Sequence, residues 1–346
     1  MKFDYTAIDQ PVSAADVAAY RSSFTLPMSV ANVQIAGFVA LVAFAAAFTL
    51  TGLIFLISSM PGAAVYAGTM LAFAALFIGG LLLASWYYGK MFKKSVKLWK
   101  FAAANGFTYV PKTKEPGYNG MMFSQGYDRA SYDQLFKKVG KGGFEFGSYS
   151  YTTGSGKNRR THTISYIGIV LERNLPQIVL DSNANNARGF GLNVSNLPVY
   201  FHKDQALKLE GDFNKYFTLY APKDYERDAL YIFTPDLMAL FIDNVAALDA
   251  EIVDNKLYVY SNAMLDFSDK KILDRVAAIV SVVGGKVLSQ TDRYADANVG
   301  DRSQDIVAPN GRRLRRGISW FAIVVIVLIF AANVVPAVMD AIGYFK

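Results

Sequence analysis

Long runs of apolar residues with no polar face dominate two parts of the chain. Residues 22–89 contain no Asp, Glu, Lys or Arg, and residues 317–339 contain none either. A transmembrane helix needs about 20 predominantly apolar residues. The pattern therefore predicts three spans, over residues 35–57, 64–88 and 318–335. A Ser-Ser-Met-Pro-Gly turn joins the first two into a hairpin.

Basic residues gather beside two of these predicted spans. Five lysines follow the second span and four arginines precede the third, at Lys90, Lys93, Lys94, Lys97, Lys100, Arg312, Arg313, Arg315 and Arg316. Lys and Arg beside a span mark its cytoplasmic end. Both clusters flank the same central segment, so we expect the N-terminus and the central domain in the cytoplasm and the C-terminus outside.

The net charge of +7 comes from the same two clusters. Without these nine side chains, the chain has 26 basic and 28 acidic residues. The positive excess therefore fits contact with the anionic headgroups of a lipid bilayer, and no nucleic-acid partner is expected.

These features divide the chain into five parts. They are a cytoplasmic N-terminal segment (1–32), a transmembrane helical hairpin (33–89), a cytoplasmic domain (90–288), a tether with the basic junction (289–316), and a third transmembrane helix with a short external tail (317–346). Ser13 and Asp16 have the spacing of a capping box, which predicts a short helix over residues 13–24.

The central domain alternates strand-like and helix-like patterns. The second span is expected to continue as a helix to the stop signal Asn105-Gly106. Strands are predicted over residues 107–110, 144–152, 161–171, 177–181, 197–201, 217–220, 229–233, 250–253 and 256–260, with a tight turn at Asp254-Asn255. Helices are predicted from Thr234 onward and over residues 269–283, the second ending at Gly284-Gly285. This order predicts an α+β domain with a mostly antiparallel sheet.

Few residues suit catalysis or the binding of a cofactor. Cysteine is absent, and the two histidines, His162 and His202, have no Glu or His partner at metal-ligand spacing. Gly154-Ser155-Gly156-Lys157 is similar to part of a phosphate-binding loop, but it lacks the first glycine and the following Ser or Thr. We expect a solvated hairpin tip at this loop, and no cofactor or metal.

A group of carboxylates is the one candidate for chemistry. Glu210, Asp212, Asp224, Glu226, Asp228 and Asp236 fall within 27 positions. Carboxylate oxygens can hold Mg²⁺ or Ca²⁺ or form an acid–base pair. The spacing matches no calcium-binding loop, however, and surface and turn carboxylates have the same distribution. Both interpretations stay open, and the second needs fewer assumptions.

Small residues recur at helical spacing in the predicted hairpin. The pairs are Ala36 and Ala40, Gly68 and Ala72, and Ala75 and Gly79. Such pairs let helices approach closely in lipid. They indicate either packing among the spans of one chain or self-association between copies. No ionisable residue lies in the middle of a span, so transport by the spans alone is not expected.

One stretch resembles a known family. Leu209–Tyr220, Asp228-Ala229 and Phe233–Met238 are similar to a signature of uncharacterised bacterial membrane proteins of actinobacterial type, whose soluble part is a domain of unknown function. The likeness covers residues 100–265. It implies a bacterial plasma (inner) membrane location and paired spans ahead of the domain, and it transfers no catalytic residue.

Three functions remain from the sequence. The first is a membrane-anchored cytoplasmic interaction or scaffold module that associates with itself or with another membrane protein. The second is a membrane-associated enzyme that uses the clustered carboxylates. The third is an accessory subunit of a transport or secretion assembly. The absence of a recognisable catalytic motif favours the first.

Overall fold

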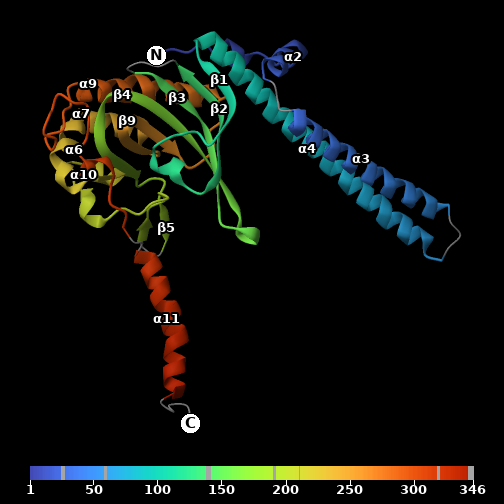
Figure 1. Cartoon of the computed structure of the whole chain (residues 1–346). Helices are drawn as coiled ribbons and strands as arrows, with labels where there is room; N and C mark the ends of the chain where they lie inside the picture. The colour runs from blue at the N-terminus through green and yellow to red at the C-terminus, as the bar shows by residue number, and fades with distance from the viewer. Residues whose placement is uncertain are drawn as a thin grey trace. The chain divides into compact units, whose positions relative to one another are not determined.

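The computed structural model describes residues 1–24, 28–57, 61–137, 142–189, 192–209, 211–317 and 320–341. They belong to two compact units, Asp4–Ala104 and Asn105–Lys346 together with Met1–Phe3. The first unit is helical, and the second is built around an antiparallel sheet (Figure 1).

The helical unit contains two short and two long helices. They are α1 (Thr6–Asp9), α2 (Ala14–Ser23), α3 (Met28–Leu56) and α4 (Ala63–Asn105). Both α3 and α4 are long and apolar enough to cross a membrane. The helix α4 continues through the lysine cluster, and Gly106 follows it with a φ of +69°, which confirms the predicted stop. The capping box is also confirmed, because the side chains of Ser13 and Asp16 each accept from the other's backbone N–H.

Aromatic rings and a glycine hold α3 and α4 together as a hairpin. The ring of Phe44 lies 5.2 Å from that of Phe77, and Phe48 lies 6.1 Å from Phe73. A Cβ added at Gly52 would meet a carbon of Leu71 at 3.0 Å. Glycine thus permits the close approach of the two helices at this level.

The short N-terminal helices pack against the lysine-bearing half of α4. Tyr20 meets Phe92 edge-on at 5.4 Å and Trp99 at 5.8 Å. Nearby, Lys100 forms an ion pair of 2.9 Å with Asp16. The lysine cluster is therefore partly used to fasten the N-terminal segment.

The described residues of the sheet unit form nine strands in two sheets. They are β1 (Thr108–Lys114), β2 (Tyr127–Lys137), β3 (Phe144–Thr153), β4 (Arg160–Ser182), β5 (Ala187–Gly189), β6 (Leu192–Val194), β7 (Ala206–Leu207), β8 (Phe217–Tyr220) and β9 (Asp249–Ser261). Seven form one sheet in the order β1-β2-β3-β4-β8-β7, with β9 also paired to β4, and β5 pairs with β6. All pairings are antiparallel, which confirms the α+β class.

The long strand β4 organises the main sheet. Its first half pairs with β3, its second half pairs with β8, and β9 pairs with both halves. The sequence predicted two separate strands here, because Pro176 interrupts the pattern. The structure instead keeps one strand and absorbs the proline in a register shift opposite β9.

The hairpin turn predicted at Asp254-Asn255 is wrong. Residues Asp249–Ser261 form one continuous strand, and Asp254 has a φ of +51° inside it. Asp254 pairs with Leu175, and the extra residues of the register shift lie in β4, between Val170 and Ile178. Asp tolerates a left-handed conformation opposite such a bulge as well as in a turn, so the pattern alone does not separate the two structures.

Helices and helical turns lie between and after the strands in the sequence of the sheet unit. They are the single turns 121–124, 156–158, 203–205 and 223–225, then α5 (Phe213–Tyr216), α6 (Glu226–Ile232), α7 (Pro235–Val245), α8 (Lys270–Ala278), a π-helical segment (Ile279–Gly284), α9 (Gly285–Thr291), α10 (Pro309–Arg312) and α11 (Trp320–Ala341). The helix predicted from Thr234 is confirmed as α7, with Pro235 in its first turn. The strand predicted over residues 229–233 is wrong, because these residues lie in and just after α6.

The helix stop predicted at Gly284-Gly285 is also wrong. The helix runs on from α8 through the π-helical segment into α9. A Cβ at Gly284 would lie 2.6 Å from the Cδ1 of Ile169 in β4. Glycine here allows the helix to lie close to the sheet rather than ending it.

A strand was also predicted over residues 197–201, and it does not form. Only Phe201 makes a bridge, to Arg316. The neighbouring segment 289–316, expected as a tether, is fastened to the sheet unit. Tyr225 donates to Asp296 at 2.7 Å, and the backbone N–H of Leu314 donates to Gln177 at 2.7 Å.

The third predicted span corresponds to α11. Its described side chains include the apolar run Ile326–Pro336, which is shorter than a spanning helix needs. Two candidate spans are thus present by length and composition, and the third stays a prediction.

Candidate functional site: the surface of the helical hairpin

The hairpin of α3 and α4 exposes nearly all of its apolar surface. Only 11% of the most apolar window of each helix is buried. Leu76, Leu82 and Leu83 are each about two-thirds exposed or more, at 73%, 66% and 68%. Exposed apolar surface on this scale marks contact with lipid or with another protein.

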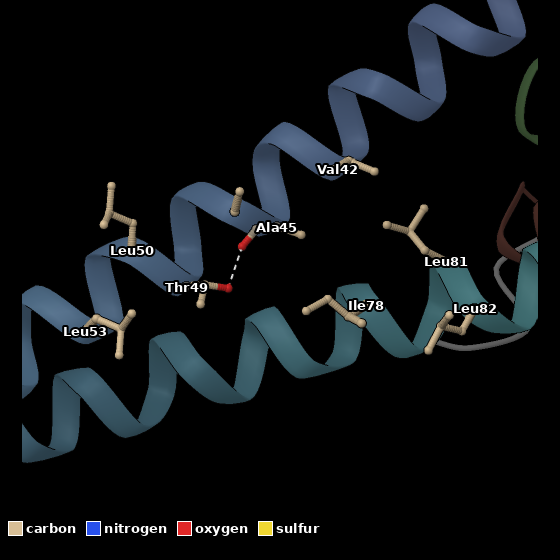
Figure 2. Close-up of a pocket in the computed structure, with 9 residues that line it drawn as sticks. Val42, Ala45, Thr49, Leu50, Leu53, Ile78, Leu81 and Leu82 are labelled. Carbon is tan, nitrogen blue, oxygen red and sulfur yellow. Dashed lines mark hydrogen bonds between the residues drawn. The ribbon is translucent and has the colours of Figure 1, made fainter.

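An apolar groove runs along one side of the hairpin (Figure 2). It has a volume of about 550 Å³ and is lined by Val42, Ala45, Ala46, Thr49, Leu50, Leu53, Ile78, Leu81 and Leu82. The hydroxyl of Thr49 donates to the carbonyl of Ala45 at 2.9 Å, as Figure 2 shows. The groove therefore presents a surface that fits an apolar partner.

A stripe of small residues lies along α4. Gly68, Ala72, Ala75 and Gly79 recur at spacings of four, three and four residues, which places them on one helical face. Gly68, Ala72 and Ala75 are exposed, and no atom of the hairpin comes within 4 Å of a Cβ added at Gly68 or Gly79. We call these four residues the α4 stripe.

The pairs Gly68–Ala72 and Ala75–Gly79 therefore do not pack against α3. The buried small residues between the helices are Ala45, Gly52, Ala63, Ala67 and Ala74. Ala40 is exposed, and the side chain of Ala36 lies outside the described residues. The α4 stripe is left for contact with another helix.

The groove and the α4 stripe lie at the same level of the hairpin. Phe44 and Phe48 in the groove-bearing part of α3 contact Phe73 and Phe77, which lie within the stretch that carries the stripe. Two copies inserted in the same direction would thus present groove and stripe at equal depth.

The predicted membrane-surface cations have diverse partners. Lys97 donates to the carbonyl of Ile8 at 2.6 Å, Lys90 lies 5.5 Å from the ring of Trp86, and Lys93 is exposed. Lys94 is partly buried. Contact of this cluster with headgroups stays a prediction.

The four predicted arginines lie on the sheet unit. Arg313 pairs with Asp254 at 2.8 Å, Arg315 pairs with Asp204 at 2.5 Å, and Arg312 donates to the carbonyl of Val307 at 2.8 Å. The side chain of Arg316 is exposed. The arginine segment therefore also fastens the chain before α11 to the rest of the sheet unit.

The six candidate carboxylates have separate partners. Asp212 pairs with Lys215, Asp224 accepts from Asn310, Asp228 accepts from Tyr294, Asp236 pairs with Lys286, and Glu226 is exposed at the start of α6. Glu210 lies outside the described residues. Within the described ranges, no three His, Asp or Glu side chains converge as a metal site would require. The structure does not gather the five described carboxylates of this set into one pocket.

The remaining motifs lie at the sheet surface. Residues 154–159 form the tip between β3 and β4, with a single helical turn at Gly156–Asn158. His162 contacts Thr153 at 2.8 Å and stacks on Tyr151, and His202 contacts Asp204 at 2.5 Å. Gly189 ends β5, and its two following residues lie outside the described ranges.

Sequence reasoning missed three buried carboxylates in the main sheet. Glu251, Asp181 and Asp249 are 0%, 2% and 0% exposed. Burial raises the pKa of Glu251 and Asp181 to about 6 and that of Asp249 to about 7. Asp181 follows the apolar strand sequence Ile-Val-Leu directly, which is the signal that places it inside the sheet.

Comparisons with known proteins identify no family. No protein-family model matches the chain, and no curated protein matches it. One similar solved structure is the mycobacterial trehalose monomycolate transport factor A, at 13% identity over 57% of this chain and 94% of that chain, with a TM-score of 0.36. A likeness at this level assigns neither a fold family nor a function, so the family resemblance stays a prediction.

Proposed function

We propose that this protein is a membrane-anchored interaction module that self-associates through its helical hairpin. In this proposal the α4 stripe of one copy packs into the α3–α4 groove of the next copy. The observation that carries it is the pair of complementary apolar surfaces, one concave and one lined by small residues, at the same depth of the hairpin.

The physics of helix packing in lipid supports this arrangement. Lipid supplies no hydrophobic force between helices, so association depends on close van der Waals contact. A helix face of Gly and Ala brings its backbone deepest into a groove. Because groove and stripe are different surfaces, the contact is heterologous, and repeated copies form a ring or a chain rather than a two-fold dimer.

Matched substitutions test the interface. Ala46→Phe fills the groove and Ala72→Phe blocks the stripe, and each is expected to abolish association in lipid nanodiscs or mild detergent. Ala47→Phe, at an exposed position of α3 outside the groove lining and away from the α4 stripe, is the matched control and should associate normally. Subunit number would be measured by single-molecule photobleaching or analytical ultracentrifugation.

Mixing the two blocked variants sharpens the test. The Ala46→Phe copy keeps its stripe and the Ala72→Phe copy keeps its groove, so together they should form a one-to-one pair. If the wild-type chain is monomeric, or if neither substitution weakens its association, the proposed interface is wrong. Loss of association without rescue on mixing would indicate a two-fold contact instead.

The proposed location is the bacterial plasma membrane, with the N-terminus and sheet domain cytoplasmic. The positive-inside pattern of the two basic clusters supports this orientation.

Single introduced cysteines can test this topology. The chain lacks cysteine, so a thiol reagent would label only the introduced residue. Ser59→Cys, which falls between α3 and α4 in the sequence, should react with an impermeant thiol reagent from outside. Ser155→Cys, at the tip between β3 and β4, should react only after lysis, and labelling of both from one side would contradict the topology.

A third span and an external C-terminus belong to the same proposal. The apolar character of α11 supports them. The enzyme and transport-accessory hypotheses stay as alternatives from the sequence. The enzyme hypothesis has less support, because the described carboxylates that it uses have separate partners on the sheet unit.

A further inference from the structure

Two carboxylates lie opposite each other on neighbouring strands of the main sheet, β4 and β9. Leu180 of β4 pairs with Ala250 of β9, so the next position in this antiparallel register sets Asp181 opposite Asp249. Directly opposed residues of an antiparallel pair project from the same face, with their Cβ atoms about 5 Å apart. Two like charges at this position repel each other unless something lies between them.

Burial makes this repulsion costly. Asp181 and Asp249 are 2% and 0% exposed, so water does not screen the pair. Among the residues that the structure describes, no Lys or Arg forms an ion pair with either carboxylate. Asp249 accepts from the backbone N–H of Ser182 at 2.9 Å and weakly from Asn262 at 3.5 Å. The side-chain amide of Asn185 also lies close enough to lower the pKa of Asp249, against the larger effect of burial.

Several oxygen atoms at this place have no hydrogen-bond donor. The Oδ1 atoms of Asp181, Asn185 and Asn196 are buried and unpaired, and the amide nitrogen of Asn185, a donor, has no acceptor either. The backbone N–H of Asn196 donates to Asn186 at 3.0 Å, and its amide donates to the carbonyl of Asn185 at 3.3 Å. These bonds hold the asparagines beside each other in one cluster. Buried polar atoms are nearly always paired, so unpaired oxygens here indicate a missing electrophilic partner.

The third buried carboxylate shows the contrast. Glu251 lies two residues along β9 and accepts from the backbone N–H of Met121 at 2.7 Å, from Gln177 at 2.6 Å and from Tyr260 at 2.8 Å. Its oxygens are satisfied by protein donors alone. At Asp181, burial raises the pKa and contacts with Ser195 and Asn186 offset the rise only in part, while its Oδ1 stays buried and unpaired.

We propose that Asp181 and Asp249 together bind one divalent cation of the Ca²⁺ or Mg²⁺ class, with the amide oxygen of Asn185 as a further ligand. The donor set consists of carboxylate and amide oxygens, which are the ligands that these hard cations prefer. One cation neutralises both opposed charges and takes up the unpaired oxygens.

The position of the cluster gives this site a structural role. Asp181 stands at the end of β4, and Asp249 begins β9. A cation between them would tie the two longest strands to residues 183–186 and 195–197, which connect β4 to the rest of the unit. The bound cation would therefore stabilise the folded sheet unit by mass action.

The test uses the full chain in mild detergent after treatment with a chelator. Calorimetric titration with CaCl₂ and MgCl₂ should show saturable binding, and the melting temperature should rise with cation concentration. Asp181→Asn and Asp249→Asn should each weaken binding at least about tenfold, as loss of a ligand charge does at oxygen-ligand sites. Glu251→Gln is the matched control and should bind within about twofold of wild type, because Glu251 is no ligand in this site.

Two results would overturn the proposal. One is a wild-type chain with no heat of binding and no shift in melting temperature at about 10 mM of either cation, which exceeds the weakest dissociation constants of calcium sites. The other is undiminished cation binding by Asp181→Asn. In the first case the two carboxylates share a proton, and acidification alone should stabilise the protein.

A second measurement works on the wild-type fold if the Asp variants fail to fold. Tb³⁺ occupies Ca²⁺ sites and emits when a nearby tyrosine is excited. Tyr220 lies two residues along β8 from Thr218, the partner of Asp181, so the two side chains project from the same face of the sheet. Burial and, less strongly, the charge of Asp181 raise the pKa of Tyr220. We expect sensitised emission that Ca²⁺ displaces and that Tyr220→Phe lowers at least twofold. Emission that is absent, or that Tyr220→Phe does not change, would contradict the site.

Discussion

The helical hairpin and the sheet unit carry similar apolar side chains and place them in opposite ways. In the hairpin, Leu82 and Leu83 are 66% and 68% exposed, whereas in the sheet unit Leu180 and Leu257 are 1% and 0% exposed. A surface that is stable only away from water must meet lipid or protein. The comparison indicates that the two units fold for different solvents.

Their polar groups differ in the same way. In the hairpin, Thr49 and Thr51 donate to carbonyls four residues earlier in their own helix, at 2.9 Å and 2.8 Å. In the sheet unit, Glu251 and Gln177 connect segments that are far apart in the sequence. Local bonding suits a helix in lipid, where each polar group must be satisfied within the protein. Long-range bonding instead specifies how the strands and loops of the sheet unit assemble.

The largest effect should come from truncating a core ring of the sheet unit. Phe146 is 0% exposed, so Phe146→Ala should lower the unfolding free energy of that unit by about 3–5 kcal/mol. Leu83→Ala in the hairpin should leave the unfolding free energy of the sheet unit unchanged. Urea unfolding of the full chain in mild detergent, followed by near-ultraviolet circular dichroism of the tyrosines, measures both. Equal losses of unfolding free energy in the two variants would contradict the difference between the sheet unit and the hairpin.

The next effect is a dependence on pH that only the sheet unit should show. Burial holds the pKa of Asp181 and Glu251 at about 6 and that of Asp249 at about 7. The folded state then binds protons more tightly than the unfolded state, so stability rises as the pH falls through these values. In chelator, unfolding should cost about 2–3 kcal/mol more at pH 5.5 than at pH 8.

Isosteric variants assign this pH dependence. Asp249→Asn should remove the largest part of it and Glu251→Gln a smaller part, because their raised pKa values differ. A saturating divalent cation should also reduce it, since metal and proton compete for the same carboxylates. A stability that instead falls steadily from pH 8 to pH 5.5 would contradict the burial of these groups.

Two adjacent glycines give a smaller and opposite pair of effects. Gly284→Ala should destabilise the sheet unit by about 1–2 kcal/mol, because its new Cβ overlaps Ile169. Gly285→Ala meets nothing within 4 Å, so it should stabilise the same helix by about 0.5–1 kcal/mol. Melting temperatures of the two variants test this directly, and a shared sign would show that the helix does not approach β4 as described.

The smallest effect concerns the ion pair that fastens the arginine segment. Arg313 and Asp254 are 49% and 34% exposed, so solvent screens their attraction. Arg313→Met should cost only about 0.5 kcal/mol, and less at high salt. A loss of several kcal/mol would show that the segment contributes to the core of the sheet unit.

Sequence patterns predicted the elements that depend on local signals. The capping box at Ser13, the helix that begins at Pro235 and the stop at Gly106 were all visible in short stretches of sequence. The long uncharged runs likewise predicted α3 and α4, because lipid-facing helices lack a polar face.

Features that depend on tertiary packing were not predictable. Asp254 carries a turn signal and Gly284 a stop signal, yet Asp254 continues a strand opposite a bulge in β4 and Gly284 makes a close contact with β4. Residues 229–233 have a strand-like composition but form part of α6, because short apolar runs fit either element. The opposition of Asp181 and Asp249 depends on strand register across 68 positions of sequence, which no local pattern contains.

Cross-linking in native membranes tests self-association through the hairpin most directly. The chain has no cysteine, so Ala46→Cys marks only the groove and Ala72→Cys marks only the α4 stripe. When differently tagged copies of the two variants are expressed together, a short bifunctional thiol reagent should link one tag to the other. Each variant alone should give little cross-linked product. No mixed product, or equal products from each variant alone, would contradict the packing of stripe into groove.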